Sequence, residues 1–187
     1  MREIIKLGLI LLIITTVAAA VLGYTNAVTK APIENQIMQA NVLARQSVLP
    51  DAVEFDALPA DVFEGYDNVL EVYKGMKNGS PVGYTIKANS SGYGGPIEVM
   101  IGIGLDGIVH GVSVGNHTET PGLGAKAADE SFKGQYSGKT VNTELVVIKS
   151  GVPKDNEVQS IAGATISSRA VTNSVNLAIR LFNEKLK

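Results

Sequence analysis

The sequence predicts an α+β domain that follows a single N-terminal transmembrane helix. Three observations support this: an uncharged apolar run near the N-terminus, two strand–turn–strand patterns in the middle of the chain, and an apolar stripe with helical spacing at the C-terminal end. The 187 residues suffice for one ordinary domain and an accessory segment. We therefore expect a cytoplasmic N-terminus and transmembrane helix over residues 1–27, a stalk helix over 28–50, and an extracytoplasmic domain over 51–187.

The apolar run extends from Leu7 to Tyr24 without a charged residue. A helix of this composition approaches the ~20 residues that cross a bilayer core. Arg2 and Lys6 precede the run, and this charge bias predicts a single-pass protein of the cell membrane with a cytoplasmic N-terminus. The alternative is a cleaved secretory signal ending near the small residues 17–20, although the apolar run continues beyond them. Both alternatives place the rest of the chain outside the cytoplasm.

The next segments predict the stalk and an antiparallel sheet. Residues 28–49 carry apolar side chains at helical spacing, and Pro50 ends the pattern. Strand patterns flank Asn78-Gly79 and then Asp106-Gly107, two dipeptides that suit the positive φ angles of tight primed turns. The alternation of polar and apolar residues predicts that one face of this sheet is packed and the other solvated.

Helices are expected to cover the packed face of the sheet. One short helix is predicted over Lys126–Tyr136, and a longer one from Ser167 onward. The apolar stripe of the longer helix consists of Val171, Val175, Ala178, Phe182 and Leu186. Between the two helices, residues 145–148 fit either a buried strand or the centre of a short helix.

Composition excludes several classes of function. Sixteen basic against 18 acidic residues give a net charge of −2, which offers no basic field for nucleic acid. The chain has no cysteine, so disulfides, iron–sulfur ligation and thiol catalysis are excluded. Its two histidines lack clustered partners, so we expect no transition-metal site. Any redox chemistry must therefore come from a bound cofactor.

A turn of small residues directly precedes the C-terminal helix. Gly163 allows tight or left-handed backbone, and Thr165, Ser167 and Ser168 place hydroxyls where the first helical N–H groups lack partners. Such a turn attracts a phosphate without needing Lys or Arg. The alternative is that Thr165 or Ser167 is simply the N-cap of the helix.

This turn resembles the flavin-attachment site of the FMN-binding domain family, whose pattern is Asp-x-x-Ser/Thr-Gly-Ala-Thr followed by further hydroxyl residues. Gly163, Ala164 and Thr165 match the pattern, and Ser167 and Ser168 fit the trailing hydroxyls. Two positions depart from it: Gln159 stands at the acidic position and Ala162 replaces the hydroxyl residue before the glycine. The resemblance implies that FMN is joined covalently through its phosphate to Thr165 by a separate Mg-dependent flavin transferase that uses FAD.

A second segment, residues 116–126, resembles the Glu-Thr-Pro-Gly-Leu-Gly loop of the respiratory members of that family, although Pro121-Gly122 alone would fit an ordinary surface turn. The order of anchor, hairpins, loop and Gly-Ala-Thr turn is similar to that of the G subunits of Rnf ion-translocating ferredoxin:NAD⁺ oxidoreductase complexes. The related Na⁺-translocating NADH:quinone reductase C subunits are typically longer. From this loop, Gly122 and Gly124 are expected to approach the flavin ring, Leu123 to pack on it, and Glu119 and Thr120 to hydrogen-bond its polar edge. Lys126 is either a partner for the negative charge of the reduced ring or a solvated surface lysine, and His117 has no assigned role.

The resemblance implies an electron-carrying subunit that turns over no substrate alone and works with the other membrane subunits of an Rnf complex. One alternative is a non-redox, membrane-anchored binding module, which would be colourless after purification from a host that contains a flavin transferase. Another is an autonomous flavin reductase. The sequence offers neither a paired acid and base nor a Gly-x-Gly-x-x-Gly nicotinamide motif for the reductase.

Overall fold

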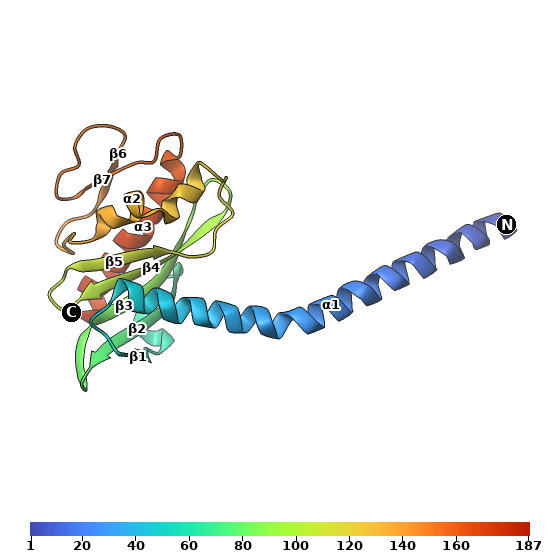
Figure 1. The fold of residues 1–187 in the computed structure, drawn as a ribbon, viewed down its shortest axis with the longest axis horizontal. Helices are drawn as coiled ribbons and strands as arrows, with labels where there is room; N and C mark the ends of the chain where they lie inside the picture. Colours follow the sequence, from blue (N-terminus) through green and yellow to red (C-terminus); the bar gives the residue numbers. More distant parts are fainter. The chain divides into compact units, whose positions relative to one another are not determined.

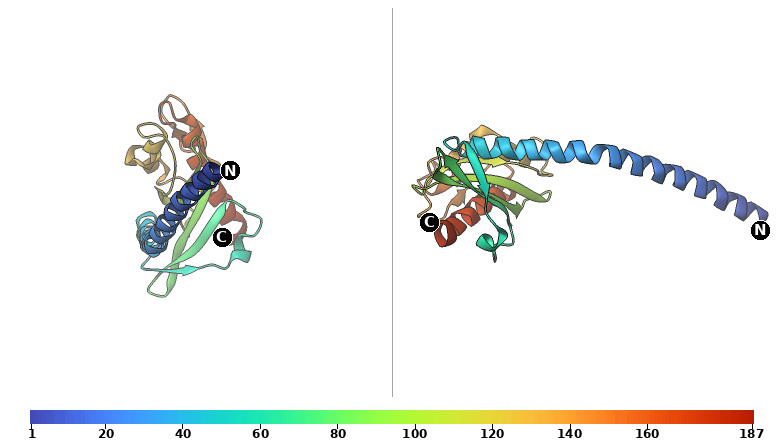
Figure 2. Two further views of the ribbon diagram at one scale, coloured as in Figure 1. Left: turned by 90° about the vertical axis from the view of Figure 1, so that its right-hand side faces the viewer. Right: turned by 90° about the horizontal axis from the view of Figure 1, so that it is seen from below.

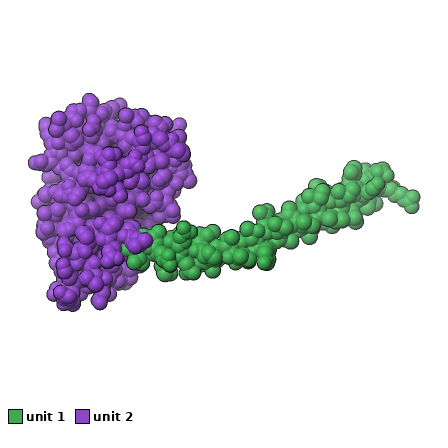
Figure 3. Space-filling view, viewed as in Figure 1, with its two compact units in different colours: residues 1–42 green, residues 43–187 purple.

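The computed structural model describes residues 1–187, which divide into two compact units, residues 1–42 and 43–187 (Figure 3). The first unit is the larger part of helix α1 (Arg2–Val48), which ends two residues before Pro50 as predicted. The apolar side chains of its first half are exposed, and the helix is long and apolar enough to cross a membrane. An N-terminal apolar helix followed by an antiparallel sheet and helices confirms the predicted α+β class.

The second unit is built on a five-stranded antiparallel sheet of order β1-β2-β3-β4-β5 (Figure 1). Its strands are β1 (Glu54–Ala57), β2 (Val69–Lys77), β3 (Ser80–Ser91), β4 (Pro96–Gly104) and β5 (Val109–Val114). Both predicted hairpins are present, as β2–β3 and β4–β5. Strand β1 is an edge strand that the sequence patterns did not predict.

The two hairpin turns differ. Asn78 and Gly79 both have positive φ, 52° and 77°, and their neighbours Lys77 and Ser80 pair directly, as a two-residue primed turn requires. Between β4 and β5 only Gly107 has positive φ, and its N–H donates to the carbonyl of Gly104 at 3.0 Å. The prediction of a primed turn at Asp106-Gly107 is therefore wrong. The Asp106 carboxylate instead accepts the Ile108 N–H, which favours the longer turn.

Both faces of the middle of the sheet are covered. Helix α3 (Thr165–Leu181) packs against β3 and β4 on one face (Figures 1 and 2). On the other face, Gly102 and Gly111 are paired neighbours that contact the backbone of Val48, at the end of α1. A side chain at Gly102 would collide with the Val48 carbonyl, so glycine there lets the helix end lie flat on the sheet. The expectation of a solvated second face is therefore wrong where the end of α1 covers β4 and β5.

Shorter elements join β1 to β2 and connect β5 to α3. They are 3-10 turns at Ala60–Phe63, Gly124–Ala128 and Gly134–Tyr136, helix α2 (Glu130–Lys133), and the parallel strands β6 (Val146–Ile148) and β7 (Glu157–Gln159). A single helix over Lys126–Tyr136 was the wrong prediction, because Asp129 is extended, with ψ 144°, and interrupts it. Residues 146–148 form a strand and not a helix, but the strand is not buried as expected, since Val146 is 52% exposed.

The core lies between α3 and the sheet. The predicted stripe residues Val171, Val175, Ala178 and Phe182 are buried, and they pack with Ile86, Ile97, Ile101 and Ile103 of the sheet. Phe182 begins a terminal π-helical turn, Phe182–Leu186, and meets the ring of Tyr84 edge-on at 6.1 Å. Because its C-terminal half is anchored in this core, α3 holds its N-terminus in a fixed place at one end of the sheet.

Candidate functional site

Helix α3 begins at Thr165 after the predicted small-residue turn. Gly163 has φ 76°, in the left-handed region that favours glycine, and Ala164 is the N-cap, with no side-chain cap. The backbone N–H groups of Thr165, Ile166 and Ser167 make no hydrogen bond. The helix therefore presents three free donors at its positive end.

The hydroxyls of the turn have separate tasks. Ser168 is fully buried; its hydroxyl donates to the Ala164 carbonyl at 2.9 Å and accepts the Ile161 N–H at 3.0 Å, so it holds the turn closed. Ser167, 1% exposed, points to the neighbouring loop. Thr165 is half-buried and makes no side-chain hydrogen bond. Neither Thr165 nor Ser167 caps the helix, so the N-cap alternative is wrong.

The loop after β5 is joined to this helix through Glu119. Ser167 donates from Oγ to Glu119 Oε2 at 2.6 Å, and the Gly94 N–H donates to Oε1 at 2.9 Å. Glu119 is only 6% exposed. Gly124 is buried beside it, and a side chain there would collide with both the Glu119 carboxylate and Ser167 Oγ. The loop that contains Glu119 and Gly124 is thus packed around one carboxylate. This carboxylate bridges the start of α3 and the β3–β4 turn.

Glu119 remains ionised despite its burial. Burial alone would raise the pKa of its carboxyl, but hydrogen bonds from Ser167 and from the N–H groups of Gly94 and Tyr93 hold that pKa below its ordinary value. The Glu119 N–H in turn donates to His117 Nδ1 at 3.3 Å. The site therefore carries a negative charge at neutral pH.

The third segment of the site is the turn between β3 and β4, which supplies Tyr93. The Thr118 hydroxyl donates to the Gly94 carbonyl at 2.8 Å, so this turn is fixed to the Glu119 loop at two points. Tyr93 is 74% exposed and lines the site, but sequence reasoning missed it. A single tyrosine in a glycine-rich turn has no pattern that marks it.

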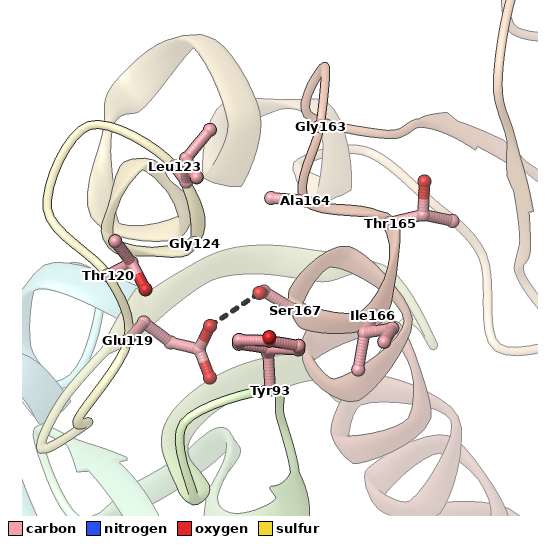
Figure 4. Close-up of a pocket in the computed structure, with 10 residues that line it drawn as sticks. All are labelled: Tyr93, Glu119, Thr120, Leu123, Gly124, Gly163, Ala164, Thr165, Ile166 and Ser167. Carbon is pink, nitrogen blue, oxygen red and sulfur yellow. Dashed lines mark hydrogen bonds between the residues drawn. The ribbon is translucent and has the colours of Figure 1, made fainter.

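These three segments enclose a cavity of about 570 Å³ (Figure 4). Its lining consists of Tyr93, Glu119, Thr120, Leu123, Gly124, Gly163, Ala164, Thr165, Ile166 and Ser167. The two sequence segments singled out for their motifs are thus brought together. Two of the predicted residues do not line the cavity. Gly122 is exposed, with φ 79°, and Ser168 is buried behind the cavity lining. Ile166 was not predicted, although it lies within the motif.

Three further residues lie beside the cavity. Lys126 and Gln159 line a separate, smaller hollow of about 190 Å³. The backbone of Gln159 pairs with the side-chain amide of Gln135, through bonds of 2.8 and 3.2 Å, which fixes the chain leading into the Gly-Ala-Thr turn. His117 contacts the cavity only through Glu119. Lys126 is exposed and does not line the cavity.

Comparison with known proteins agrees with this arrangement. Residues 92–180 match the FMN-binding domain, and residues 1–47 match the RnfG N-terminal region. The chain is 45% identical to the G subunit of the Na⁺-translocating ferredoxin:NAD⁺ oxidoreductase complex of Acetobacterium woodii, over 100% of this chain and 95% of that protein. It is 33% identical to the G subunit of the ion-translocating oxidoreductase complex of Methanosarcina acetivorans, over 95% and 94%.

A solved structure shares the fold. The C subunit of the Na⁺-translocating NADH-quinone reductase of Parabacteroides distasonis superposes with a TM-score of 0.51 at 25% identity, covering 61% of this chain and 63% of that one. The matched FMN-binding region contains all three segments of the cavity, and the N-terminal match contains the apolar helix. The chain therefore belongs to the family of G subunits of Rnf-type ion-translocating oxidoreductase complexes, as a membrane protein with an FMN-binding domain.

Proposed function

We propose that this protein carries electrons on an FMN joined through its phosphate to the hydroxyl of Thr165. The observation that carries the proposal is the position of that hydroxyl. Thr165 is the first residue of α3, it lines the 570 Å³ cavity, and its side chain has no hydrogen-bond partner in the protein. The hydroxyl is thus available for esterification, whereas those of Ser167 and Ser168 are engaged in hydrogen bonds.

The start of α3 fits a phosphate. The N–H groups of Thr165, Ile166 and Ser167 are free, and the 17-residue helix adds its positive dipole end. An esterified phosphate on Thr165 would lie within reach of these donors, because they belong to the same helical turn. The absence of Lys and Arg from the lining is no obstacle to such a site.

The remainder of the cavity fits a flat aromatic ring system. Its volume lies within the ~300–1,000 Å³ typical of small-molecule sites. Leu123, Ile166 and Tyr93 present exposed apolar surface around it, at 46%, 52% and 74% exposure, and such surface gains from contact with a ring. When bound, FMN supplies the capacity to accept and release one or two electrons. The protein contributes attachment, orientation and the local charge.

Attachment requires a separate enzyme. The proposed flavin transferase joins the Thr165 oxygen to the FMN phosphorus of FAD, and the bond from that phosphorus to the AMP moiety breaks. The hydroxyl proton is lost and AMP leaves, so the protein gains one FMN less one water. Because the linkage is at the phosphate, the redox potential of the flavin ring is set by the residues that contact the ring noncovalently.

The proposed topology follows the charge bias around the span. Arg2 and Lys6 lie before the apolar run, which favours a cytoplasmic N-terminus and an extracytoplasmic domain. A cysteine-free chain lends itself to a direct check, because a single cysteine introduced at exposed Thr143 would be the sole thiol. Labelling of Thr143→Cys by an impermeant maleimide in intact cells supports the topology, and labelling only after lysis refutes it.

The attachment is tested by intact mass. Co-expression with a flavin transferase is expected to add one FMN less one water to the wild-type chain and nothing to Thr165→Ala. Thr143→Ala is the matched control, since this exposed threonine lies away from the cavity, and it should gain the full increment. An unmodified wild-type chain, or an increment that persists in Thr165→Ala, would contradict the proposal.

A further inference from the structure

We propose that Glu119 is a fixed negative charge in the cofactor cavity and that it lowers the affinity of the bound flavin for electrons. This inference rests on the proposed function, since it concerns the FMN that the cavity would hold. It assigns Glu119 a different task from hydrogen-bonding the polar edge of the ring.

Both oxygens of Glu119 are held by the protein. Oε2 accepts the Ser167 hydroxyl at 2.6 Å and Oε1 accepts the Gly94 N–H at 2.9 Å. These bonds come from two different segments, so the carboxylate cannot turn toward a ligand without breaking one of them. It is therefore preorganised, and its position does not depend on what the cavity contains.

No Lys or Arg of the cavity wall neutralises this charge. The lining contains no Lys or Arg, and Glu119 belongs to none of the ion pairs of the structure. Its hydrogen-bond donors are neutral groups of Ser167 and the backbone, and His117, the one titratable group that acts on its carboxyl, accepts the Glu119 N–H and does not line the cavity. Since Glu119 is 6% exposed, solvent screens the charge weakly.

A ring in the cavity would lie close to this carboxylate, because Glu119 and Thr165 line the same space. Each electron added to the ring brings negative charge unless a proton follows it. A like charge in a partly desolvated cavity disfavours that addition. The equilibrium constant for reduction is therefore lower than it would be beside a neutral side chain, and the protein becomes a better electron donor.

The test is a redox titration of the flavin-loaded protein with dithionite as the electron source and solvent as the proton source. Glu119→Gln removes the charge and nearly keeps the shape, so the reduction constant should rise about tenfold, which is about 30 mV for a two-electron couple. Ser167→Ala keeps the charge but removes its hydrogen bond, and it should shift the constant by less than a third of that amount on the logarithmic scale. Glu130→Gln is the matched control, because this side chain is 80% exposed and outside the cavity.

Loading is verified by intact mass before each titration, which separates failure of the proposed function from failure of this inference. A wild-type chain that carries no FMN contradicts the proposed function. The charge assignment is overturned if flavin-loaded Glu119→Gln has the same reduction constant as the wild type. It is also overturned if Ser167→Ala shifts the reduction constant as much as Glu119→Gln does. Should Glu119→Gln not fold, Glu119→Met is titrated instead, because it also removes the charge and its side chain has a similar volume. An increased constant then supports the inference, and an unchanged one overturns it.

Discussion

Ser167 Oγ lies 2.6 Å from Glu119 Oε2, across 48 residues of sequence, and this contact joins the start of α3 to the loop that follows β5. Both side chains are buried, at 1% and 6% exposure. The contact unites two motifs, a Gly-rich loop and a Gly-Ala-Thr turn, that the chain separates by the whole α2 region. Both residues line the cavity, so the contact links two of its walls.

Loss of the contact should destabilise the domain. Ser167→Ala removes the donor to a buried carboxylate, and hydrogen bonds to charged groups contribute about 1.5–3 kcal/mol. We expect a decrease of about that size in the free energy of unfolding of the cofactor-free protein, measured by urea denaturation. Thr165→Ala, at a half-buried hydroxyl without a partner, should change it by less than about 0.5 kcal/mol. Equal effects of the two substitutions would show that the bond is unimportant for the fold.

The same carboxylate should give the domain an acid-sensitive contribution to stability. The pKa of Glu119 is lower in the folded protein than its usual 4.5, so its contribution is complete above pH 4.5 and is lost as pH falls through the folded-state pKa. Glu119→Gln has no such dependence. The stability difference between wild type and Glu119→Gln should therefore be constant from pH 5 to 7 and shrink below pH 4.5, as followed by urea unfolding at each pH. A stability difference between wild type and Glu119→Gln that grows on acidification would contradict this prediction.

Glycine at position 102 should be required for the end of α1 to lie on the sheet. A Cβ at Gly102 would collide with the Val48 carbonyl, which is backbone and cannot rotate away. Gly102→Ala is expected to lower the free energy of unfolding by about 1–3 kcal/mol, as overpacking does. At Gly115 the nearest atom to an added Cβ is 3.5 Å away, an ordinary contact, so Gly115→Ala is the control with a smaller loss. Similar losses at both positions would mean that the collision with Val48 is not the reason for glycine at position 102.

Local patterns predicted most of the fold. The Asn78-Gly79 turn, the apolar stripe of α3 and the helix stop before Pro50 each follow from a few adjacent residues. The missed elements depend on distant partners. Strand β1 is four residues long with two acidic side chains, and β7 has three residues that pair in parallel with β6. The second sheet face was mispredicted because only tertiary structure places Val48 over Gly102.

The site was predictable where a motif marks it and not elsewhere. Thr165, Leu123 and Glu119 stand in recognisable segments and do line one cavity. Tyr93 joins them only because Glu119 and Thr118 bind the turn that carries it. The pairing of Glu119 with Ser167 also lay beyond sequence reasoning, since neither residue type nor spacing specifies a partner 48 positions away.

The central claim is tested most directly by locating the flavin on the chain. Trypsin cleavage after Lys154 and Arg169 releases residues 155–169, which contain Thr165 together with Ser160, Ser167 and Ser168. Fragmentation of this peptide from the transferase-treated protein should place the FMN phosphate on Thr165 alone. A flavin found on Ser167 or Ser168, on another peptide, or on none would contradict the account.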